Sequence, residues 1–259
     1  MRVEKVLAPN PSPWTGPGTN TWVIGDDHEA LVLDPGPVID AHADAIATTV
    51  GGRRVVAVVV THTHLDHAPL ANPLAGNWRT VSLGYAPSDE FVPDARLVEG
   101  STIAVAGSEL EVLHTPGHAD DHLCFVLDRW MFTGDHIMGG STVMVQDLTA
   151  YLASLRKVRD RALDRLFPGH GPEIDDPAGV IDHYISHRLE REEQVIAALR
   201  SGAGSIGAIV EDVYADVDAA LHPIAAHSVA AHVGKLVDDG VVDFDRTTDL
   251  WASLVRLVR

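Results

Sequence analysis

The segment from Thr61 to His67, THTHLDH, constrains this chain more than any other. It continues from a run of β-branched residues, RVVAVVVTH, that begins at Arg54 and predicts a fully buried strand entering a polar loop. Its imidazoles and its carboxylate are groups that hold zinc-type metal ions. Alternate side chains of a continuing strand diverge, so these groups can converge on metal only from a turn. Such spacing rarely arises in a plain polar loop, and we predict a metal site formed by His62, His64, Asp66 and His67.

Three further loops share this design, because each follows an apolar, strand-like run. TPGHADDH contains His118, TGDH contains Asp135, and FPGHGP contains His170. Taken alone, a histidine after Pro-Gly is more often a turn residue than a ligand. If the strands lie side by side, all four loops open at one edge, and together they offer seven ligands, enough for two metal ions.

The chain divides into two parts by its pattern of elements. The first two-thirds alternates strands with helices, including a strand at Ala30–Gly36 and a hairpin through Asp128-Arg129. From Ala178 onward the sequence is mostly helical, with a long helix at 180–199 and further helices near 206–214 and 224–239. The spacing of apolar residues in the last helix predicts one buried face, formed by Val229, Val233, Leu236 and Val237. A short two-stranded end then completes the outline of a winged helix. We predict a catalytic domain over 1–190 and a winged-helix-like domain over 191–259.

The motif H-x-H-x-D-H, with separate His, Asp and His loops after it, resembles the metallo-β-lactamase superfamily. The resemblance implies an α/β fold, an αβ/βα sandwich that holds metals at the edge of two sheets. It implies that one ion is bound by His62, His64 and His118, and a second by Asp66, His67 and His170. It further implies that Asp135 bridges both ions and that Asp34, in LVLDPG, orients ligands from behind.

Position 135 narrows the resemblance within the superfamily. The main subclass of class B β-lactamases carries Cys there, whereas glyoxalase II, ribonuclease Z and their relatives carry Asp. His64 stands where the flavodiiron oxidases of this fold typically have Glu. The resemblance therefore implies a di-zinc hydrolase, with Mn²⁺ or Fe²⁺ as alternatives to the two Zn²⁺ ions.

A narrower resemblance covers nearly the whole chain. NPSPWTGPGTNTWVIG, TPGHADDHLCFVL, PGHGPEI and YISHRLEREEQVI are similar to β-lactamase-like proteins that include an endoribonuclease and carry a C-terminal winged helix. The same subfamily includes thioester hydrolases. In both activities a metal-bridging hydroxide is the nucleophile, and Asp66 would be the catalytic residue that accepts its hydrogen bond. The resemblance therefore implies single-stranded RNA as the first candidate substrate, with a small (glyoxalase II-like) or carrier-bound thioester as the alternative.

Four further residues have two interpretations each. His122 either orients the third metal loop from behind or makes a structural hydrogen bond at a strand start. The YISHR segment contributes the other three, which either line the substrate mouth or pack between domains: Tyr184, His187 and Arg188.

The charge of the chain limits its partners. A net charge of −18 argues against tight non-specific binding to nucleic acid or an anionic membrane. Residues 191–259 hold six basic and eleven acidic side chains, so duplex DNA would be repelled and a DNA-binding regulator is the least favoured function. We expect this domain to act as a lid, a packing element or a homodimer contact.

Cysteine content and the N-terminal sequence bear on the compartment. The chain has one cysteine, Cys124, so neither a disulfide scaffold nor a Cys-rich zinc site can form within it. The N-terminal residues contain no apolar stretch of signal-peptide type, and no apolar run is long enough to span a bilayer. We expect a cytoplasmic protein.

Overall fold

The computed structural model describes residues 1–140 and 142–258, which form two compact units. The first unit consists of residues 1–143 and 160–178, and the second of residues 144–159 and 179 onward. The domain boundary that we placed at residue 190 falls inside one helix, α4 (Pro177–Arg200). The division at that residue stays a prediction.

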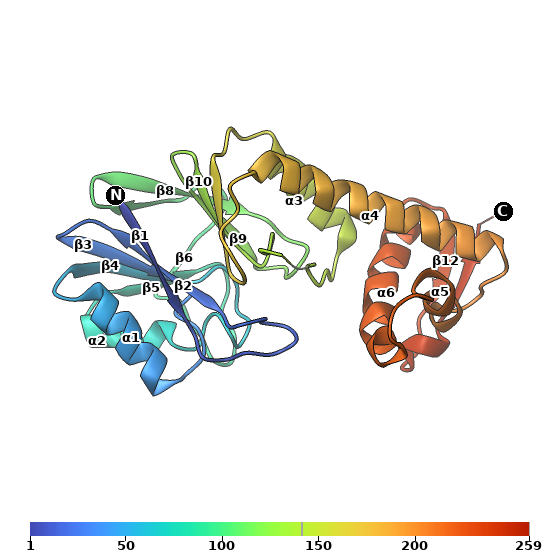
Figure 1. Cartoon of the computed structure of the whole chain (residues 1–259), viewed down its shortest axis with the longest axis horizontal. Helices are drawn as coiled ribbons and strands as arrows, with labels where there is room; N and C mark the ends of the chain where they lie inside the picture. Colours follow the sequence, from blue (N-terminus) through green and yellow to red (C-terminus); the bar gives the residue numbers. More distant parts are fainter. Residues whose placement is uncertain (141, 259) are drawn as a thin grey trace. The chain divides into compact units, whose positions relative to one another are not determined.

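A six-stranded sheet begins the first unit. Strands β1 and β2 are antiparallel, as are β2 and β3, and the pairs from β3 to β6 are parallel. Helices α1 (Asp40–Val50) and α2 (Ala71–Trp78) connect parallel strands and lie along one face of this sheet (Figure 1). The strands, in sheet order, are β1 (Arg2–Leu7), β2 (Asn20–Gly25), β3 (Glu29–Leu33), β4 (Arg54–Val59), β5 (Val81–Gly84) and β6 (Ala95–Arg96).

A five-stranded sheet completes the first unit, in the order β11-β10-β9-β8-β7. Its neighbours are antiparallel except β10 and β11, which are parallel. The predicted hairpin joins β9 to β10 through Asp128, whose φ of 54° is a backbone conformation that Asp tolerates. The strands are β7 (Thr102–Val105), β8 (Ser108–His114), β9 (Leu123–Leu127), β10 (Trp130–Gly134) and β11 (Arg165–Pro168).

Two apolar cores explain why β4 is apolar from Val55 onward. Ala57 and Val59 pack into the core between the two sheets, where Trp22 meets the ring of Phe167 edge-on at 5.1 Å between centroids. Val58 belongs to the other core, which lies between the first sheet and helices α1 and α2. A strand covered on both faces needs apolar residues at successive positions, so the predicted buried strand is confirmed.

The second unit is mainly helical and ends in an antiparallel ribbon. The predicted helix face at Val229, Val233 and Leu236 is buried in its core. Val237 is exposed, so its assignment to that face was wrong; it lies one residue before the helix ends. The elements besides α4 are α3 (Leu148–Arg159), α5 (Ile206–Val213), α6 (His222–Asp238), β12 (Val242–Asp245), β13 (Leu254–Leu257), and the 3₁₀ turns at Ala219–Leu221 and Leu250–Ala252.

Helix length and composition also bear on membranes. Among the residues that the structure describes, no helix combines the length and the apolar character needed to cross a bilayer.

Candidate metal centre

Four loops bring the seven predicted side chains together in the first unit. The THTHLDH loop follows β4, and the other three loops follow β8, β10 and β11. Their ligand-type atoms form three overlapping groups in which all atoms lie within 4.8 Å of one another. These groups are His62, His64 and His118; His62, His67 and Asp135; and Asp66, His67 and His170.

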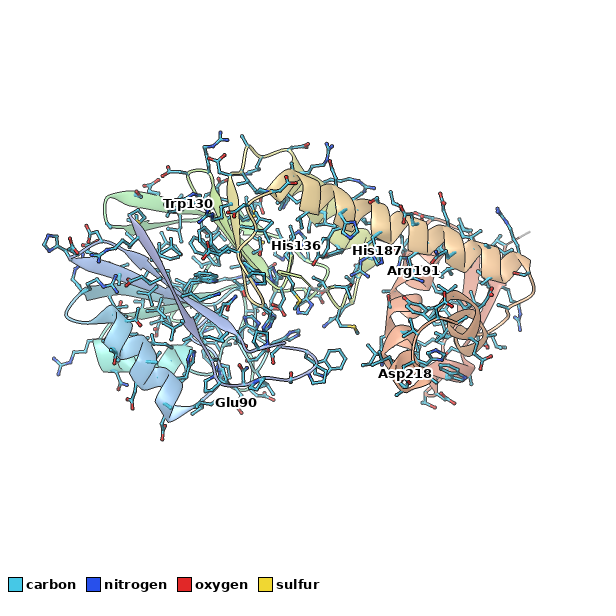
Figure 2. All side chains as sticks on the ribbon, in the orientation of Figure 1. Glu90, Trp130, His136, His187, Arg191 and Asp218 are labelled. Carbon is cyan, nitrogen blue, oxygen red and sulfur yellow. The ribbon has the colours of Figure 1, made fainter. Side chains whose placement is uncertain are left out.

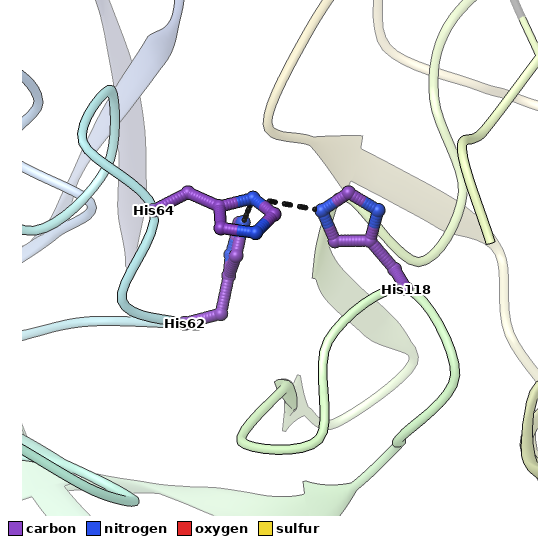
Figure 3. A group of neighbouring side chains, drawn as sticks. All are labelled: His62, His64 and His118. Carbon is purple, nitrogen blue, oxygen red and sulfur yellow. Dashed lines mark hydrogen bonds between the residues drawn. The ribbon is translucent and has the colours of Figure 1, made fainter. Parts of the chain in front are cut away.

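The first group consists of three imidazoles that face each other (Figure 3). His64 Nδ1 lies 2.9 Å from His62 Nε2 and 3.0 Å from His118 Nε2. Nitrogens that share a tetrahedral zinc ion at bond lengths of about 2.0–2.1 Å lie roughly 3.3 Å apart. The three rings are therefore spaced closely enough to bind one ion after small adjustments.

Asp66, His67 and His170, called the second group from here on, are two imidazoles and one carboxylate. His67 Nε2 lies 3.3 Å from His170 Nε2, and Asp66 Oδ2 lies 3.4 Å from the first of these nitrogens and 3.2 Å from the second. His67 is fully buried, whereas the Asp66 carboxylate is partly exposed. This arrangement offers two nitrogens and one oxygen to a second ion.

Asp135 lies between the two groups. Its Oδ1 is 3.4 Å from His67 Nε2 and 3.3 Å from His170 Nε2, and its Oδ2 is 3.7 Å from His118 Nε2. The two oxygens thus face different groups, which is the geometry that a bridging ligand requires. Gly169 permits this approach, because a Cβ at that position would lie 2.7 Å from Asp135 Oδ1.

Asp34 holds the second group from behind. Its carboxylate accepts hydrogen bonds from Thr61 N at 2.7 Å and Thr61 Oγ1 at 2.8 Å, and it contacts His67 Nδ1 at 2.9 Å. A carboxylate at Nδ1 keeps the proton there and leaves the lone pair of Nε2 free for a metal. Asp34 thus sits where the resemblance implies an orienting aspartate.

His122 supports the backbone at Asp135. Its Nε2 accepts a hydrogen bond from Asp135 N at 3.1 Å, so the ring proton is on Nδ1 and points to Thr115 Oγ1 at 2.9 Å. Gly134, with a φ of 47°, leaves room for this contact, since a Cβ there would lie 2.9 Å from His122 Nε2. This hydrogen bond supports the local structure and also holds the backbone of Asp135, a proposed metal ligand.

Sequence reasoning missed the loop that precedes β2. Thr19 Oγ1 donates to Asp66 Oδ2 at 3.2 Å, and His170 Nδ1 contacts the carbonyl oxygen of Gly18 at 3.2 Å. Neither threonine nor glycine is a residue that the sequence would mark as a metal ligand. Both reach the site only because distant segments of the chain pair with each other. Their contacts fix the orientation of one carboxylate and one imidazole of the second group.

Burial and charge set the protonation of the two groups differently. Burial, reinforced by the neighbouring His67, lowers the pKa of His62 well below its usual value, so this ring is neutral. Burial also opposes a charge on His170, but Asp135 and Asp66 outweigh it and raise its pKa to about 9. Burial would raise the pKa of Asp66, yet His67 and His170 lower it. In the metal-free protein the second group thus holds protonated imidazoles between ionised carboxylates.

This donor set fits divalent metal ions. The imidazoles of the first group direct ring nitrogens toward one another, and the second group already stabilises positive charge between two carboxylates. Nitrogen and oxygen donors of this kind suit zinc, manganese and iron. The ligand assignment itself remains a proposal.

The three residues predicted to lie near substrate are on α4, in the second unit. Tyr184 and Arg188 are buried and His187 is half-buried. Their role beside the substrate stays a prediction.

Comparison with known proteins agrees with the fold. Residues 14–170 match the family model for the metallo-beta-lactamase superfamily, and residues 205–251 match the beta-lactamase associated winged helix domain. A sandwich with His/Asp loops at its edge defines a class of metal-dependent hydrolases, and the chain belongs to the metallo-beta-lactamase superfamily. The predicted fold class, including the C-terminal winged helix, is confirmed.

Several relatives align over most of the chain. A protein of Caenorhabditis elegans named beta-lactamase-like protein 2 homolog is 32% identical over 93% of this chain and 86% of its own length. An atrochrysone carboxyl ACP thioesterase of Aspergillus chevalieri is 35% identical over 83% of this chain and 74% of its own length. A beta-lactamase domain protein of Burkholderia ambifaria shares the fold, with a TM-score of 0.84 at 21% identity over 99% of this chain and 91% of that one.

Proposed function

We propose that this hydrolase cleaves thioesters with an apolar acyl group, carried by a small thiol or an acyl carrier, and that it uses two divalent ions, zinc first among them. The observation that carries the proposal is the position of Asp135, whose two oxygens face separate groups of metal-type donors. When bound, such a pair of ions polarises a carbonyl group and lowers the pKa of a water molecule, which makes hydrolysis feasible at neutral pH.

Asp66 is the residue proposed to move protons. Neighbouring histidines keep its pKa low, so the carboxylate is ionised at neutral pH and accepts a hydrogen bond from an attacking water. Its side chain is partly exposed, whereas Asp135 is buried, so Asp66 is the carboxylate that substrate can approach. A thiolate leaving group needs little help from an acid, because thiols have pKa values of about 8.5.

Exposed apolar side chains near the centre favour a thioester over RNA. Leu65 lies between His64 and Asp66 in the metal loop and is 68% exposed. Trp14 is 55% exposed on the loop whose end, at Gly18 and Thr19, contacts the second group. Large apolar groups exposed around a polar centre typically mark a place where apolar ligand surface is buried.

The net charge of the chain also favours a thioester over RNA. RNA binding relies on basic side chains that contact phosphates, whereas this chain has a net charge of −18. Relatives named as acyl-carrier-protein thioesterases support the same choice at 31–35% identity.

The test is side-by-side turnover by the zinc-loaded full chain. The substrates are a thioester series of increasing acyl length and a single-stranded RNA, and Asp66→Ala serves as the blank. Asp121→Asn is the matched control, because Asp121 accepts a hydrogen bond from Thr63 N in the same loop but belongs to neither donor group.

We expect thioester turnover that rises with acyl length, that Asp121→Asn retains and that falls at least a hundredfold in Asp66→Ala. RNA should remain intact. Cleavage of RNA that disappears in Asp66→Ala, with no turnover of any thioester, would establish the endoribonuclease alternative instead.

A further inference from the structure

A buried histidine without hydrogen-bond partners marks the interior of the second unit. His232, on α6, is 1% exposed, and neither ring nitrogen has a hydrogen-bond partner within residues 1–140 and 142–258. Buried polar atoms in native proteins nearly always have a partner from protein, water or ligand. An imidazole with both nitrogens buried and unpartnered therefore points to a bound group that the chain alone does not supply.

Basic side chains surround this histidine. Burial, followed by the positive charges of Arg188 and Arg191, lowers the pKa of His232 to about 3, and His187 and Lys235 contribute in the same direction. Burial and the same two arginines lower the pKa of His187 as well. The two arginines, His187 and Lys235 thus all lie within electrostatic reach of His232. Such a cluster of like charges is unfavourable by itself, and it occurs in a chain whose net charge is negative.

The charges around the cluster are only partly balanced. Lys235 pairs with Glu192 at 2.9 Å and with Asp239 at 2.6 Å, so its charge is compensated. The carboxylate of Glu190 raises the pKa of His187, but this is the smallest of the effects on that pKa.

The arginines make different contacts. Arg191 donates to the carbonyl oxygen of Val213 at 3.0 Å and lies 4.3 Å from the ring centroid of Tyr214, and the described residues include no carboxylate that pairs with it. Arg188 is 5% exposed and lies 5.6 Å from the ring centroid of Tyr151, on α3. The aromatic contact holds the Arg191 guanidinium group in place without neutralising its charge.

One side of the cluster reaches solvent. His187, Arg191 and Lys235 are half-buried, whereas His232 and Arg188 are buried. His187 and Arg191 lie one helical turn apart on α4 (Figure 2). The cluster thus extends from buried groups to groups that solvent partly reaches.

We propose that Arg188, Arg191 and His232 form a binding site for a phosphate group. Guanidinium groups match phosphate oxygens with paired hydrogen bonds, and a neutral imidazole supplies one N–H donor. The phosphate has two candidate sources, free inorganic phosphate and the phosphate ester of 4′-phosphopantetheine, the arm that holds acyl groups on carrier proteins. The second source rests on the proposed thioester function, whereas the first does not.

The experiment is calorimetric titration of the full chain with sodium phosphate, 4′-phosphopantetheine and unphosphorylated pantetheine, at constant ionic strength. The variants are Arg191→Gln and His232→Phe, and the control is Arg200→Gln, which alters an exposed arginine at the end of the same helix. NMR of the histidine ring protons, recorded on the same samples, reports on His232 directly and checks that each variant is folded.

We expect saturable binding of phosphate, a shift of the His232 resonances, and at least tenfold weaker binding in Arg191→Gln and His232→Phe but not in Arg200→Gln. Tighter binding of 4′-phosphopantetheine than of phosphate, with none of pantetheine, would identify the ester as the source. Tighter binding of inorganic phosphate would identify the free anion. Absence of binding by either phosphate compound, or equal binding by all folded variants, would overturn the proposal. Neither result depends on thioester turnover, so the two proposals fail separately.

Discussion

Exchange of Asp34 for asparagine isolates the role of one hydrogen bond in metal binding. Asp34 Oδ1 accepts from Thr61 N, and its Oδ2 contacts Thr61 Oγ1 and His67 Nδ1. In Asp34→Asn the carbonyl oxygen keeps the backbone contact and an NH₂ group replaces the second oxygen. The NH₂ group can donate to Thr61 Oγ1, which still has a lone pair for His62. Asparagine also tolerates the φ of 51° at this position, so the backbone should stay in place.

The consequence falls on His67. An NH₂ donor at Nδ1 favours the tautomer with the proton on Nε2, and that nitrogen then has no lone pair for a metal. Loss of a residue that holds a ligand from behind typically weakens metal binding about 10–100-fold, which equals about 1.4–2.8 kcal/mol. We expect a loss of this size for the ion at Asp66, His67 and His170, and little change for the ion at His62, His64 and His118.

The assay is a competitive zinc titration of wild type, Asp34→Asn and Asp121→Asn, with nitrogen NMR of the His67 ring to identify its tautomer. Asp121→Asn makes the same chemical change beside the metal loop without a contact to a ring nitrogen, and it should bind both ions normally. Equal weakening of both ions in Asp34→Asn, or an unchanged His67 tautomer with normal binding, would refute the reasoning.

Four further predictions concern metal loading, the pH dependence of stability and the binding of duplex DNA. Asp135→Ala should lose both ions whereas His170→Ala should weaken mainly one, and elemental analysis showing equal losses would contradict the proposed division of ligands. Metal loading at neutral pH should release protons, because the pKa of His170 is about 9 in the metal-free protein; calorimetry in two buffers of different ionisation enthalpy measures this, and zero release would contradict it. That raised pKa also stabilises the metal-free fold below about pH 6.5, and the stabilisation should disappear as the pH rises through about 9, which thermal melts can follow. The full chain should show no salt-sensitive binding of duplex DNA; sub-micromolar binding that Arg256→Gln and Lys235→Gln weaken would revive the regulator interpretation.

The sequence predicted the parts of the fold that have a local signal. The buried strand β4, the hairpin at Asp128 and helices α4 to α6 follow from apolar periodicity and turn residues. Strand β6 has only two residues, both exposed, so no periodic pattern could indicate it. Val237 was misassigned because an apolar stripe predicts which face of a helix is buried, but not how far along the helix the neighbouring elements cover that face.

The site likewise has residues that the sequence predicted and residues that it could not predict. Metal-type residues at strand ends carry a signal in their chemistry, and the seven of them do come together. Thr19 and Gly18 reach the second group only because β2 lies beside the loop that follows β11, with an isolated bridge between Thr19 and His170. Long-range pairings of this kind have no trace in the local sequence. The buried state of His232 likewise depends on how α4 and α6 pack, which periodicity alone does not specify.

Anomalous diffraction from crystals of the zinc-loaded protein tests the central claim most directly. Two peaks should appear about 3.5–4 Å apart, as in other two-metal hydrolases. One should be bound by His62, His64 and His118, the other by Asp66, His67 and His170, with a carboxylate oxygen of Asp135 directed at each. A single peak, or two peaks with His170 turned away from both, would contradict the division of the site into two metal positions.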